Sequence, residues 1–391
     1  MKSRIFHLIV GASLSLSALG AGAQDIVKVG IIAPLSGQFS ASFGVPFRQG
    51  VEAWVAENGN KVAGKQVKFI WRDLDAPNPE RAKAIAQELI IKEKVQYLAG
   101  FDVTPNALAV APLIQRAKIP TVIFNASTSM IVSKSDYFVR VSNTLPQVTV
   151  PVAKFALETG VKRIVTIVTD YGPGVDAENA FRSTFQAGGG TVVESIRMPF
   201  QSTDFGPFLQ KIRAVKPDAL FAFLPFGPPT FGFLKAYDAN GLRTEKIRFL
   251  GTGETQETDL QALGNVALTL ETGYYYSSAH DSPENKAFLK TLAKIHPKAV
   301  ANPATVSAYD GARLIYRMIE ATGGLQNGEK AMAAVKGWSF MSPRGPVKID
   351  ATTRDIVQNV YMRTVERSAN GELVNREFKT YAAQPDYGVQ K

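Results

Sequence analysis

The chain contains no cysteine among its 391 residues. That absence excludes disulfide bonds, thiolate metal sites and cysteine nucleophiles. It also excludes the lipid-bearing cysteine that tethers many exported bacterial proteins to a membrane. A chain of this length can bury enough apolar surface to be stable without disulfide bonds. Export from the cytoplasm therefore remains compatible with the composition.

Histidine is scarce too, and the chain holds only three. His280 and His296 have no acidic residues beside them at the spacing of metal ligands. No Gly-x-Ser-x-Gly sequence marks a hydrolase nucleophile. The segment Gly172-Pro173-Gly174 lacks the third glycine of a dinucleotide loop and the Lys-Ser/Thr ending of a phosphate loop, so it predicts a tight strand-to-helix turn beside a cleft. We expect no metal, no cofactor and no enzymatic activity.

Long apolar runs are missing, and the apolar run near the N-terminus is short. Lys2 and Arg4 precede residues 8–19, which are fewer than the roughly 20 residues that span a bilayer as a helix. The run is followed by Ala21-Gly22-Ala23, a small-x-small pattern typical of signal cleavage. We predict a cleaved signal peptide at residues 1–23 and a mature periplasmic protein that is not a lipoprotein. An uncleaved anchor or a buried N-terminal helix is the alternative.

Basic residues are scattered, with no run of five or more, although the net charge is +10. A concentrated basic patch would favour nucleic acid or an anionic membrane as a partner, whereas a scattered charge indicates an ordinary soluble surface. Hydrophobic residues make up 45% of the chain and charged residues 20%, as in soluble globular proteins. The length indicates two domains. We expect no binding to nucleic acid.

The sequence does contain an alternation of short apolar strands and longer amphipathic helices, which indicates an α/β fold with parallel sheets. In the first half the expected strands are 27–32, 66–71, 95–99 and 119–124, and the expected helices are 47–57, 79–92 and 106–117. In the second half the expected strands are 163–169, 191–197, 219–224 and 247–250, and the expected helices are 148–158, 177–186, 205–215 and 231–239. The tail is less regular, with helices expected at 284–295, 305–321 and 329–335 and strands at 356–365 and 378–381.

Small, polar and aromatic residues follow four of the expected strands, where open α/β sheets bind their ligands. The four clusters are 100–105, 125–129, 170–172 and 225–227. Helix N-termini at such places offer unpaired N–H groups and a partial positive charge, which suit carboxylates. Each cluster alone could form a turn or a cap, and Thr104 is placed to cap the next helix. Together they favour one shared cleft.

The chain resembles the periplasmic solute-binding proteins of ABC transporters, in their branched-chain amino-acid (Leu/Ile/Val) class. Five segments carry the likeness: Ile31-Ile32-Ala33-Pro34-Leu35-Ser36-Gly37, Gly50-Val51-Glu52-Ala53, Trp71-Arg72-Asp73, Asn125-Ala126-Ser127-Thr128 and Asp170-Tyr171-Gly172-Pro173-Gly174. It covers essentially the whole chain after the signal peptide. It is greatest for a subgroup associated with aromatic acids.

The resemblance implies the type I periplasmic binding fold. In that fold, two doubly wound Rossmann-like α/β lobes are joined by three hinge crossovers and close over a ligand like a Venus flytrap. The crossovers would fall near residues 139–144, 272–277 and 350–356. Lobe 1 would then combine residues 24–144 with 275–350, and lobe 2 would combine residues 145–274 with 351–391.

The resemblance also implies which residues hold the ligand's carboxylate. A hydroxyl after the third strand matches Thr104. A turn after the fourth strand, which offers backbone and hydroxyl groups, matches Ala126 and Thr128, and Ser127 lies between them. These four residues would form the polar end of the site.

Aromatic positions of the family match this chain as well. The aromatic residue after the first loop matches Phe43, and those of the second lobe match Tyr171 and Phe226. With Phe101, they would make a cleft suited to an aromatic ligand, although core packing is the alternative role for one or two of the phenylalanines.

One departure from the family concerns the carboxylate that pairs with the ammonium of an amino acid. Gly253 stands at the matching position, and Glu254 follows it. A buried ammonium without a partner costs several kcal/mol. If Glu254 cannot reach the ligand, amino acids should bind poorly.

We therefore expect a monomeric periplasmic receptor that captures a small hydrophobic or aromatic carboxylate and delivers it to an ABC permease in the inner membrane. Three alternatives stay open: a Leu/Ile/Val-binding protein, a ligand-sensing ectodomain that docks on a signalling protein, and an exported enzyme.

Overall fold

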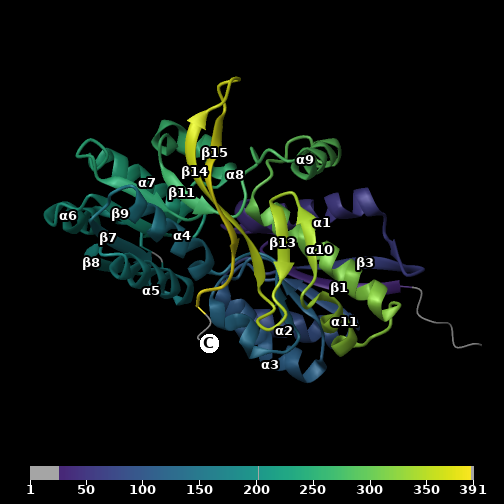
Figure 1. Ribbon diagram of the computed structural model, residues 1–391. Coiled ribbons are helices and arrows are strands. Elements are labelled where there is room, and N and C mark those ends of the chain that lie inside the picture. Colours follow the sequence, from purple (N-terminus) through teal and green to yellow (C-terminus); the bar gives the residue numbers. More distant parts are fainter. Residues whose placement is uncertain (1–25, 201, 389–391) are drawn as a thin grey trace, which may run out of the picture.

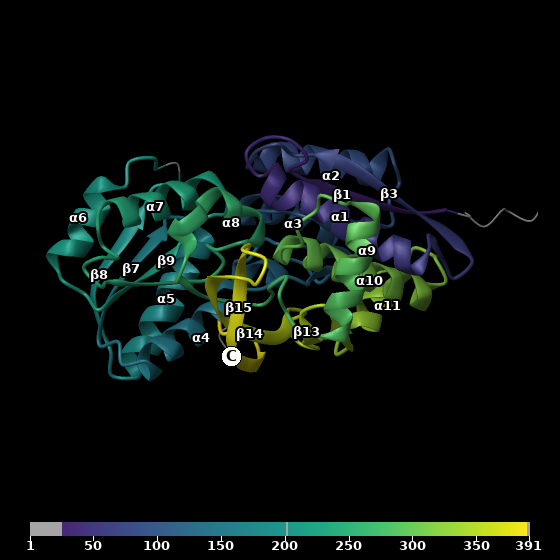
Figure 2. The ribbon, with the colours of Figure 1, turned by 90° about the horizontal axis from the view of Figure 1, so that it is seen from above.

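The computed structural model describes residues 26–200 and 202–388. Two α/β halves lie side by side, and the hairpin of β14 (Ile356–Arg367) and β15 (Leu373–Gln384) stands between them (Figures 1 and 2). The signal peptide expected at residues 1–23 lies outside the described residues. Within those residues, no helix has the length and apolar character needed to cross a membrane.

The sheet of the first half has six strands in the order β2-β3-β1-β4-β5-β6. They are β1 (Ile26–Ala33), β2 (Lys61–Val62), β3 (Lys65–Asp73), β4 (Tyr97–Gly100), β5 (Thr121–Ile123) and β6 (Phe138–Arg140). Neighbours pair in parallel except in the short β2–β3 hairpin. Residues 29–33 of β1 are all buried, as expected for a central parallel strand with helices on both faces.

Helices from two distant parts of the chain cover this first sheet. They are α1 (Val45–Asn58), α2 (Pro79–Ile91), α3 (Thr104–Ala117), α9 (Pro283–Ile295), α10 (Pro303–Thr322) and α11 (Gly328–Val335), with the shorter η1 (Ser40–Gly44) and η2 (Ser129–Lys134). Asn302 and Thr305 form a reciprocal capping box that starts α10. This helix packs so closely along α1 that a side chain at Gly50 would collide with the backbone carbonyl of Thr305. The segment that follows the second half in sequence thus returns to the first.

The second sheet has nine strands and is mixed. It contains β7 (Arg163–Thr169), β8 (Thr191–Met198), β9 (Ala219–Phe223), β10 (Arg248–Gly251), β11 (Glu271–Tyr274), β12 (Ser339–Ser342) and β13 (Gly345–Ile349), with β14 and β15. The order is β12-β13-β14-β11-β10-β9-β7-β8, and β15 pairs with β14. Strands β7 to β11 pair in parallel, whereas β12 to β15 join through antiparallel pairs.

The helices of the second half are α4 (Leu145–Glu158), α5 (Gly172–Ala187), α6 (Gly206–Ala214), α7 (Pro228–Ala239) and α8 (Glu257–Leu263), followed by η3 (Gly264–Ala267). Four of the five have proline in their first turn, where no backbone N–H is lost from the helix. Helix α5 begins directly at Gly172, so the turn predicted at this segment is confirmed.

The structure differs from the expectations in two ways. Strands β2, β6 and β11 and the hairpin β12–β13 were not expected, and the hairpin extends the second sheet through its pairing with β14. Thr104 does not cap α3, because it is already the first helical residue and Val103 takes the cap position. The lobe boundary predicted at residue 350 falls between two paired strands of one sheet, β13 and β14, and the division into lobes stays a prediction.

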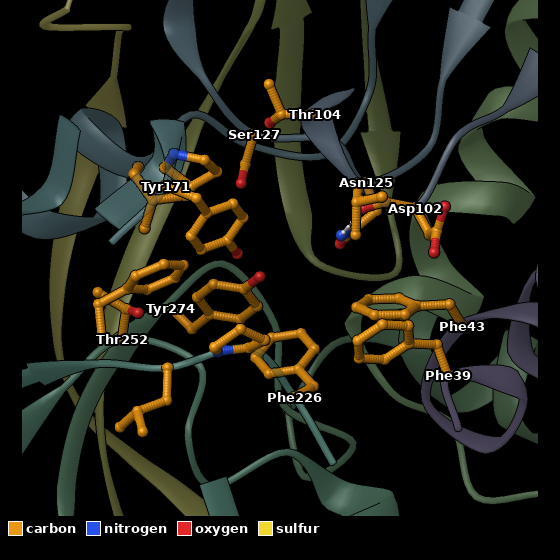
Figure 3. A pocket seen from close by; sticks show the side chains of 16 residues that line it. Phe39, Phe43, Asp102, Thr104, Asn125, Ser127, Tyr171, Phe226, Thr252 and Tyr274 are labelled. Atoms are coloured by element: carbon orange, nitrogen blue, oxygen red, sulfur yellow. Dashed lines mark hydrogen bonds between the residues drawn. The ribbon is translucent and has the colours of Figure 1, made fainter. Parts of the chain in front are cut away.

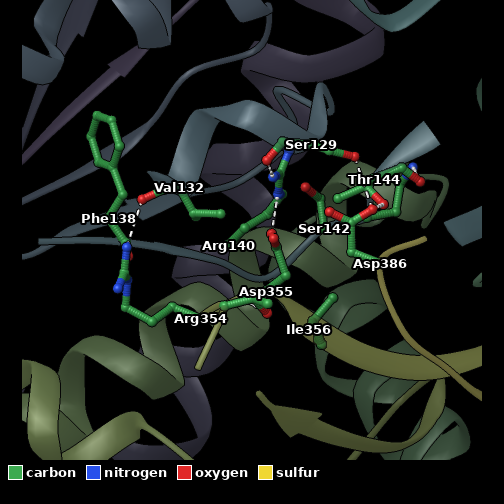
Figure 4. Close-up of polar contacts among 12 residues, drawn as sticks. Ser129, Val132, Phe138, Arg140, Ser142, Thr144, Arg354, Asp355, Ile356 and Asp386 are labelled. Carbon is green, nitrogen blue, oxygen red and sulfur yellow. Dashed lines mark hydrogen bonds and ion pairs between the residues drawn. The ribbon is translucent and has the colours of Figure 1, made fainter. Parts of the chain in front are cut away.

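Arg140 is fully buried where the chain first passes from one half to the other (Figure 4). Its Nε donates to Oδ1 of Asp355 at 2.6 Å, and its terminal nitrogen donates to the carbonyls of Ala126 and Thr128 at 2.8 and 2.9 Å. Asp355 lies in the connection between β13 and β14 and directly precedes β14. One side chain therefore joins the first passage to this connection and to the turn that follows β5.

Two further buried arginines contact the passages. Arg344 pairs with Asp310 at 2.7 Å and also donates to the carbonyl of Val141. Arg363 donates to the carbonyl of Tyr276 at 2.6 Å. Because Val141 follows β6 and Tyr276 follows β11, each of these two passages has a guanidinium bound to its backbone.

Candidate functional site

The sheet register brings several strand ends to one level. In the first sheet Ile32 pairs with Gly100, which pairs with Ile123, so β1, β4 and β5 end together. In the second sheet β7, β9 and β10 end together in the same way. The loops after these strands therefore face a common space, at the place where open α/β sheets bind ligands.

A pocket lies between the two sets of loops (Figure 3). Its empty space is about 510 Å³, open mouth included. The lining residues come from both halves and are mainly aromatic, apolar or hydroxyl-bearing. They are Phe39, Phe43, Asp102, Val103, Thr104, Asn125, Ser127, Leu145, Tyr171, Pro173, Phe223, Leu224, Pro225, Phe226, Thr252 and Tyr274.

The structure brings most of the residues expected at the site together. Five of the nine expected residues line the pocket: Phe43, Thr104, Ser127, Tyr171 and Phe226. The other four stand behind its wall: Phe101, Ala126, Thr128 and Glu254. Their contacts show why they do not reach it.

Three of these four residues support the polar loops. Phe101 is buried in a left-handed conformation with φ of 66°, and its backbone bonds to Ile32 and Ala126 at 3.0 Å. It thereby joins the ends of β1 and β5. The hydroxyl of Thr128 lies 3.0 Å from the hydroxyl of Thr104. Thr128 therefore orients a residue that lines the pocket.

Glu254 is turned toward the backbone of the strand ends. Its carboxylate accepts hydrogen bonds from the N–H groups of Thr252 at 2.5 Å and Leu224 at 3.2 Å. Burial raises its pKa to about 7, against the opposite effect of these hydrogen bonds. A side chain at Gly253 would collide with the ring of Phe226. Neither position 253 nor position 254 presents a carboxylate to the pocket.

Aromatic rings form the apolar part of the pocket and connect the two halves. Phe43 stacks on Phe226 with 5.5 Å between ring centroids, so the two halves are in contact. Tyr171 stacks on Phe223 at 6.1 Å, and its side chain points into the open space in Figure 3. Burial raises the pKa of Tyr171 far above neutrality, so its hydroxyl stays a hydrogen-bond donor. Tyr274 meets Phe226 edge-on at 6.0 Å.

The sequence did not single out several of the lining residues. Asp102 and Asn125 lie inside clusters recognised after the third and fourth strands, and only their position in those clusters could have indicated them. Phe39 and Tyr274 gave no signal, because the helical turn before α1 and the antiparallel partner of β11 are not visible in the sequence pattern. Thr252 is placed by the hydrogen bond from its N–H to Glu254, described above.

Two α/β lobes with a pocket at their facing strand ends define a two-lobed ligand-binding protein. The "Periplasmic binding protein" family matches residues 26–372, and the chain belongs to this family. The type I periplasmic binding fold and the resemblance to the Leu/Ile/Val class are thereby confirmed.

Similar proteins include a curated relative and several solved structures. "Leu/Ile/Val-binding protein homolog 6" from Brucella abortus (strain 2308) is 49% identical over 385 residues, which are 97% of each chain. An ABC-transporter solute-binding protein from Rhodopseudomonas palustris HaA2, in complex with p-hydroxybenzoic acid, is 53% identical with a TM-score of 0.91 and covers 93% of this chain and 99% of its own. Another from R. palustris BisB5, in complex with 3,4-dihydroxybenzoic acid, is 40% identical with a TM-score of 0.88 and the same coverage.

Proposed function

We propose that this protein is the substrate-binding component of an ABC importer and that it binds a small aromatic carboxylate between its lobes. The pocket carries the proposal, because it combines hydroxyl groups at strand ends with a wall of aromatic rings. Relatives with bound p-hydroxybenzoic and 3,4-dihydroxybenzoic acid support this ligand class. The protein would act as a binder and not as an enzyme.

The ligand's carboxylate would meet the hydroxyls of Thr104, Ser127 and Tyr171. The side chains of Ser127 and Tyr171 form no hydrogen bond within residues 26–200 and 202–388, so both hydroxyls are available. A hydrogen bond to a charged group contributes roughly 1.5–3 kcal/mol, and micromolar affinity needs about 8 kcal/mol. Three such bonds and one buried ring reach this range before the entropy of binding is subtracted.

The ring of the ligand would lie beside the stacked phenylalanines. Phe43 and Phe226 already contact each other, so a third ring does not fit between them. The remaining space is bounded by Tyr171 on one side and Asn125 on the other (Figure 3). A single-ring acid suits this space.

Leucine-like amino acids are the alternative ligands, because curated relatives carry Leu/Ile/Val-binding names. The ammonium of such a ligand would need a carboxylate partner near its own carboxylate. Glu254 does not supply one, since its carboxylate is bound to the backbone N–H groups of Thr252 and Leu224 and does not line the pocket. Asp102 does line the pocket, but it lies away from Tyr171, where the ligand's own carboxylate would bind (Figure 3). The structure therefore supports aromatic acids over amino acids.

Isothermal titration calorimetry tests the ligand class. We expect 4-hydroxybenzoate or a related aromatic acid to bind with micromolar affinity or better, and leucine to give no measurable heat. Tight leucine binding without a response to any aromatic acid would reverse the assignment.

Delivery to a permease requires that the lobes open and close. In this proposal lobe 1 holds residues 24–144 and 275–350, lobe 2 holds the remainder, and ligand favours the closed state because it contacts both lobes. The periplasmic location after signal cleavage, the monomeric state and the permease partner belong to the same proposal. Small-angle scattering should show compaction when ligand is added, and an unchanged radius would contradict the hinge motion.

A further inference from the structure

Asp102 is a buried carboxylate with one oxygen that has no hydrogen-bond partner, and it lines the ligand pocket. Its exposed fraction is 2%, and its Oδ2 has no partner within residues 26–200 and 202–388. The carboxylate has a long contact of 3.4 Å from Oδ1 to the amide of Asn106, and the backbone N–H groups of Asp102 and Val103 also favour its ionised form. Buried polar atoms are rarely left without partners in folded proteins. Because Asp102 also lines the pocket, this oxygen is placed where a bound ligand can supply the missing partner.

The loop geometry holds Asp102 in this place. Gly100 and Phe101 both adopt positive φ, which turns the chain back after β4. The amide nitrogen of Asn125 donates to the backbone carbonyl of Asp102 at 2.7 Å. In Figure 3 Asp102 and Asn125 lie together on the side of Phe43, away from Tyr171. Backbone and neighbour thus fix the carboxylate at one side of the pocket.

The chemistry of Asp102 decides what it can accept. Burial raises its pKa to about 6, so the group is mainly ionised at neutral pH and acts as a hydrogen-bond acceptor. It repels the carboxylate of a ligand and attracts a donor. A ligand would therefore place its carboxylate at the hydroxyls of Ser127 and Tyr171 and direct an uncharged donor toward Asp102.

We propose that Asp102 accepts a hydrogen bond from a hydroxyl group on the ring of the bound aromatic acid, at the end remote from the ligand's carboxylate. Asp102 would thereby select hydroxylated over unsubstituted aromatic acids. This inference rests on the proposed function and narrows its ligand class. A hydrogen bond to an ionised group is of the size that changes affinity about 10- to 100-fold, and a ligand without the hydroxyl leaves the carboxylate unpaired.

Calorimetry with three ligands of similar size tests the selection in the intact mature protein. 4-Hydroxybenzoate carries the donor, benzoate lacks the substituent, and 4-fluorobenzoate fills the position without donating. We expect 4-hydroxybenzoate to bind about 10- to 100-fold more tightly than either of the others. Equal affinity for all three ligands overturns the role of Asp102 and leaves the proposed function intact. Failure of all three to bind overturns the proposed function itself.

Substitution of the carboxylate gives the second arm. In Asp102→Leu the preference for 4-hydroxybenzoate over benzoate should fall to within about threefold, through weaker binding of the hydroxylated acid. Asp102→Asn keeps the shape of the side chain but is a weaker acceptor. Its preference for 4-hydroxybenzoate over benzoate should lie between those of the parent protein and the leucine variant, so the test remains possible if the leucine variant does not fold. A preference that is unchanged in Asp102→Asn overturns the proposal. The proposal is also overturned if the parent protein binds leucine more tightly than 4-hydroxybenzoate and Asp102→Asn loses that leucine binding.

Asp259 provides a matched control. It is 5% exposed, its Oδ2 also lacks a partner among the described residues, and burial raises its pKa to about 6, yet it does not line the pocket. Asp259→Asn should leave the ratio of the affinities for 4-hydroxybenzoate and benzoate unchanged within about twofold. If this affinity ratio fell as far in Asp259→Asn as in Asp102→Asn, the change would be a general effect of removing a buried charge. That result would overturn the proposed hydrogen bond to Asp102.

Discussion

Buried charged groups are paired in the passages that connect the lobes, whereas those at the ligand pocket are not. In the passages each fully buried arginine lies within 4 Å of a carboxylate, in the pairs Arg140–Asp355, Arg344–Asp310 and Arg363–Glu257. At the pocket, Asp102 and Glu254 form no ion pair among the described residues, and the hydroxyl of Tyr171 has no partner there. Paired buried charges hold a fixed backbone geometry. The side chains of Asp102 and Tyr171 line the pocket and remain available to a ligand, whereas Glu254 is bound to the backbone behind it. The comparison predicts that substitutions in the passages reduce stability and that substitutions in the pocket reduce affinity.

The largest effect is expected at Arg344. Arg344→Met would leave Asp310 buried without its cation, and breaking a buried pair in this way costs about 3–5 kcal/mol. Urea unfolding should show this loss in the free energy of unfolding. Replacing both partners, as in Arg344→Met with Asp310→Leu, should recover much of the loss because no buried charge then lacks a partner.

An exposed pair gives the control for this prediction. Arg376 and Glu366 approach to 2.5 Å with side chains that are 51% and 42% exposed. Arg376→Met should cost less than about 1 kcal/mol, since water screens such pairs. If Arg344→Met were no more destabilising than Arg376→Met, the passages could not be held by buried charge.

A smaller effect is expected from the pH dependence of stability. Burial raises the pKa of Glu254 from 4.5 to about 7, so the folded protein binds this proton more tightly than the unfolded chain. The free energy of unfolding should therefore fall as pH rises from about 4.5 to about 7, by roughly 3 kcal/mol from this group. Asp102 and Asp259, with pKa values of about 6, act in the same direction.

Glu254→Gln tests this slope, because glutamine does not titrate. Urea unfolding of the ligand-free protein across this pH range should give a visibly flatter dependence in the variant. If the two free energies of unfolding differ by the same amount at every pH, the difference arises only from the changed hydrogen bonds of Thr252 and Leu224. Such parallel curves would contradict the raised pKa of Glu254.

The repeating part of the fold and the helices of the tail could be predicted from the sequence, whereas the pairing of the tail strands could not. Parallel strands and their helices leave a strong alternation of apolar and amphipathic segments, so β1, β3 to β5 and β7 to β10 were expected near their observed positions. The short strands β2 and β6 were not expected. The hairpin β12–β13 depends on a partner strand, β14, and the local pattern does not record that partner. Hydrophobic periodicity gave no indication that residues 283–335 return to the first lobe, and only the resemblance to the family did.

The site shows the same division between local and tertiary information. Thr104, Ser127, Tyr171 and Phe226 follow strand ends, and the rule for open α/β sheets was sufficient to place them in one cleft. The orientation of Glu254 depends on two backbone N–H groups, one of them 30 positions away at Leu224. No local pattern could reveal that hydrogen bond or the vacant oxygen of Asp102.

The smallest effect on stability and a clear effect on affinity are expected from removing single hydroxyls in the pocket. Tyr171→Phe keeps the ring, which stacks on Phe223 and meets Phe200 edge-on at 5.0 Å, and loses only the donor. Ser127→Ala likewise removes a hydroxyl without a protein partner among the described residues. Each variant should bind 4-hydroxybenzoate about 10- to 100-fold more weakly, because one hydrogen bond to the carboxylate is lost. Their unfolding free energies should stay within about 0.5 kcal/mol of the parent. A variant that binds normally would move the carboxylate to another part of the pocket, and a variant that unfolds easily would erase the contrast with the passages.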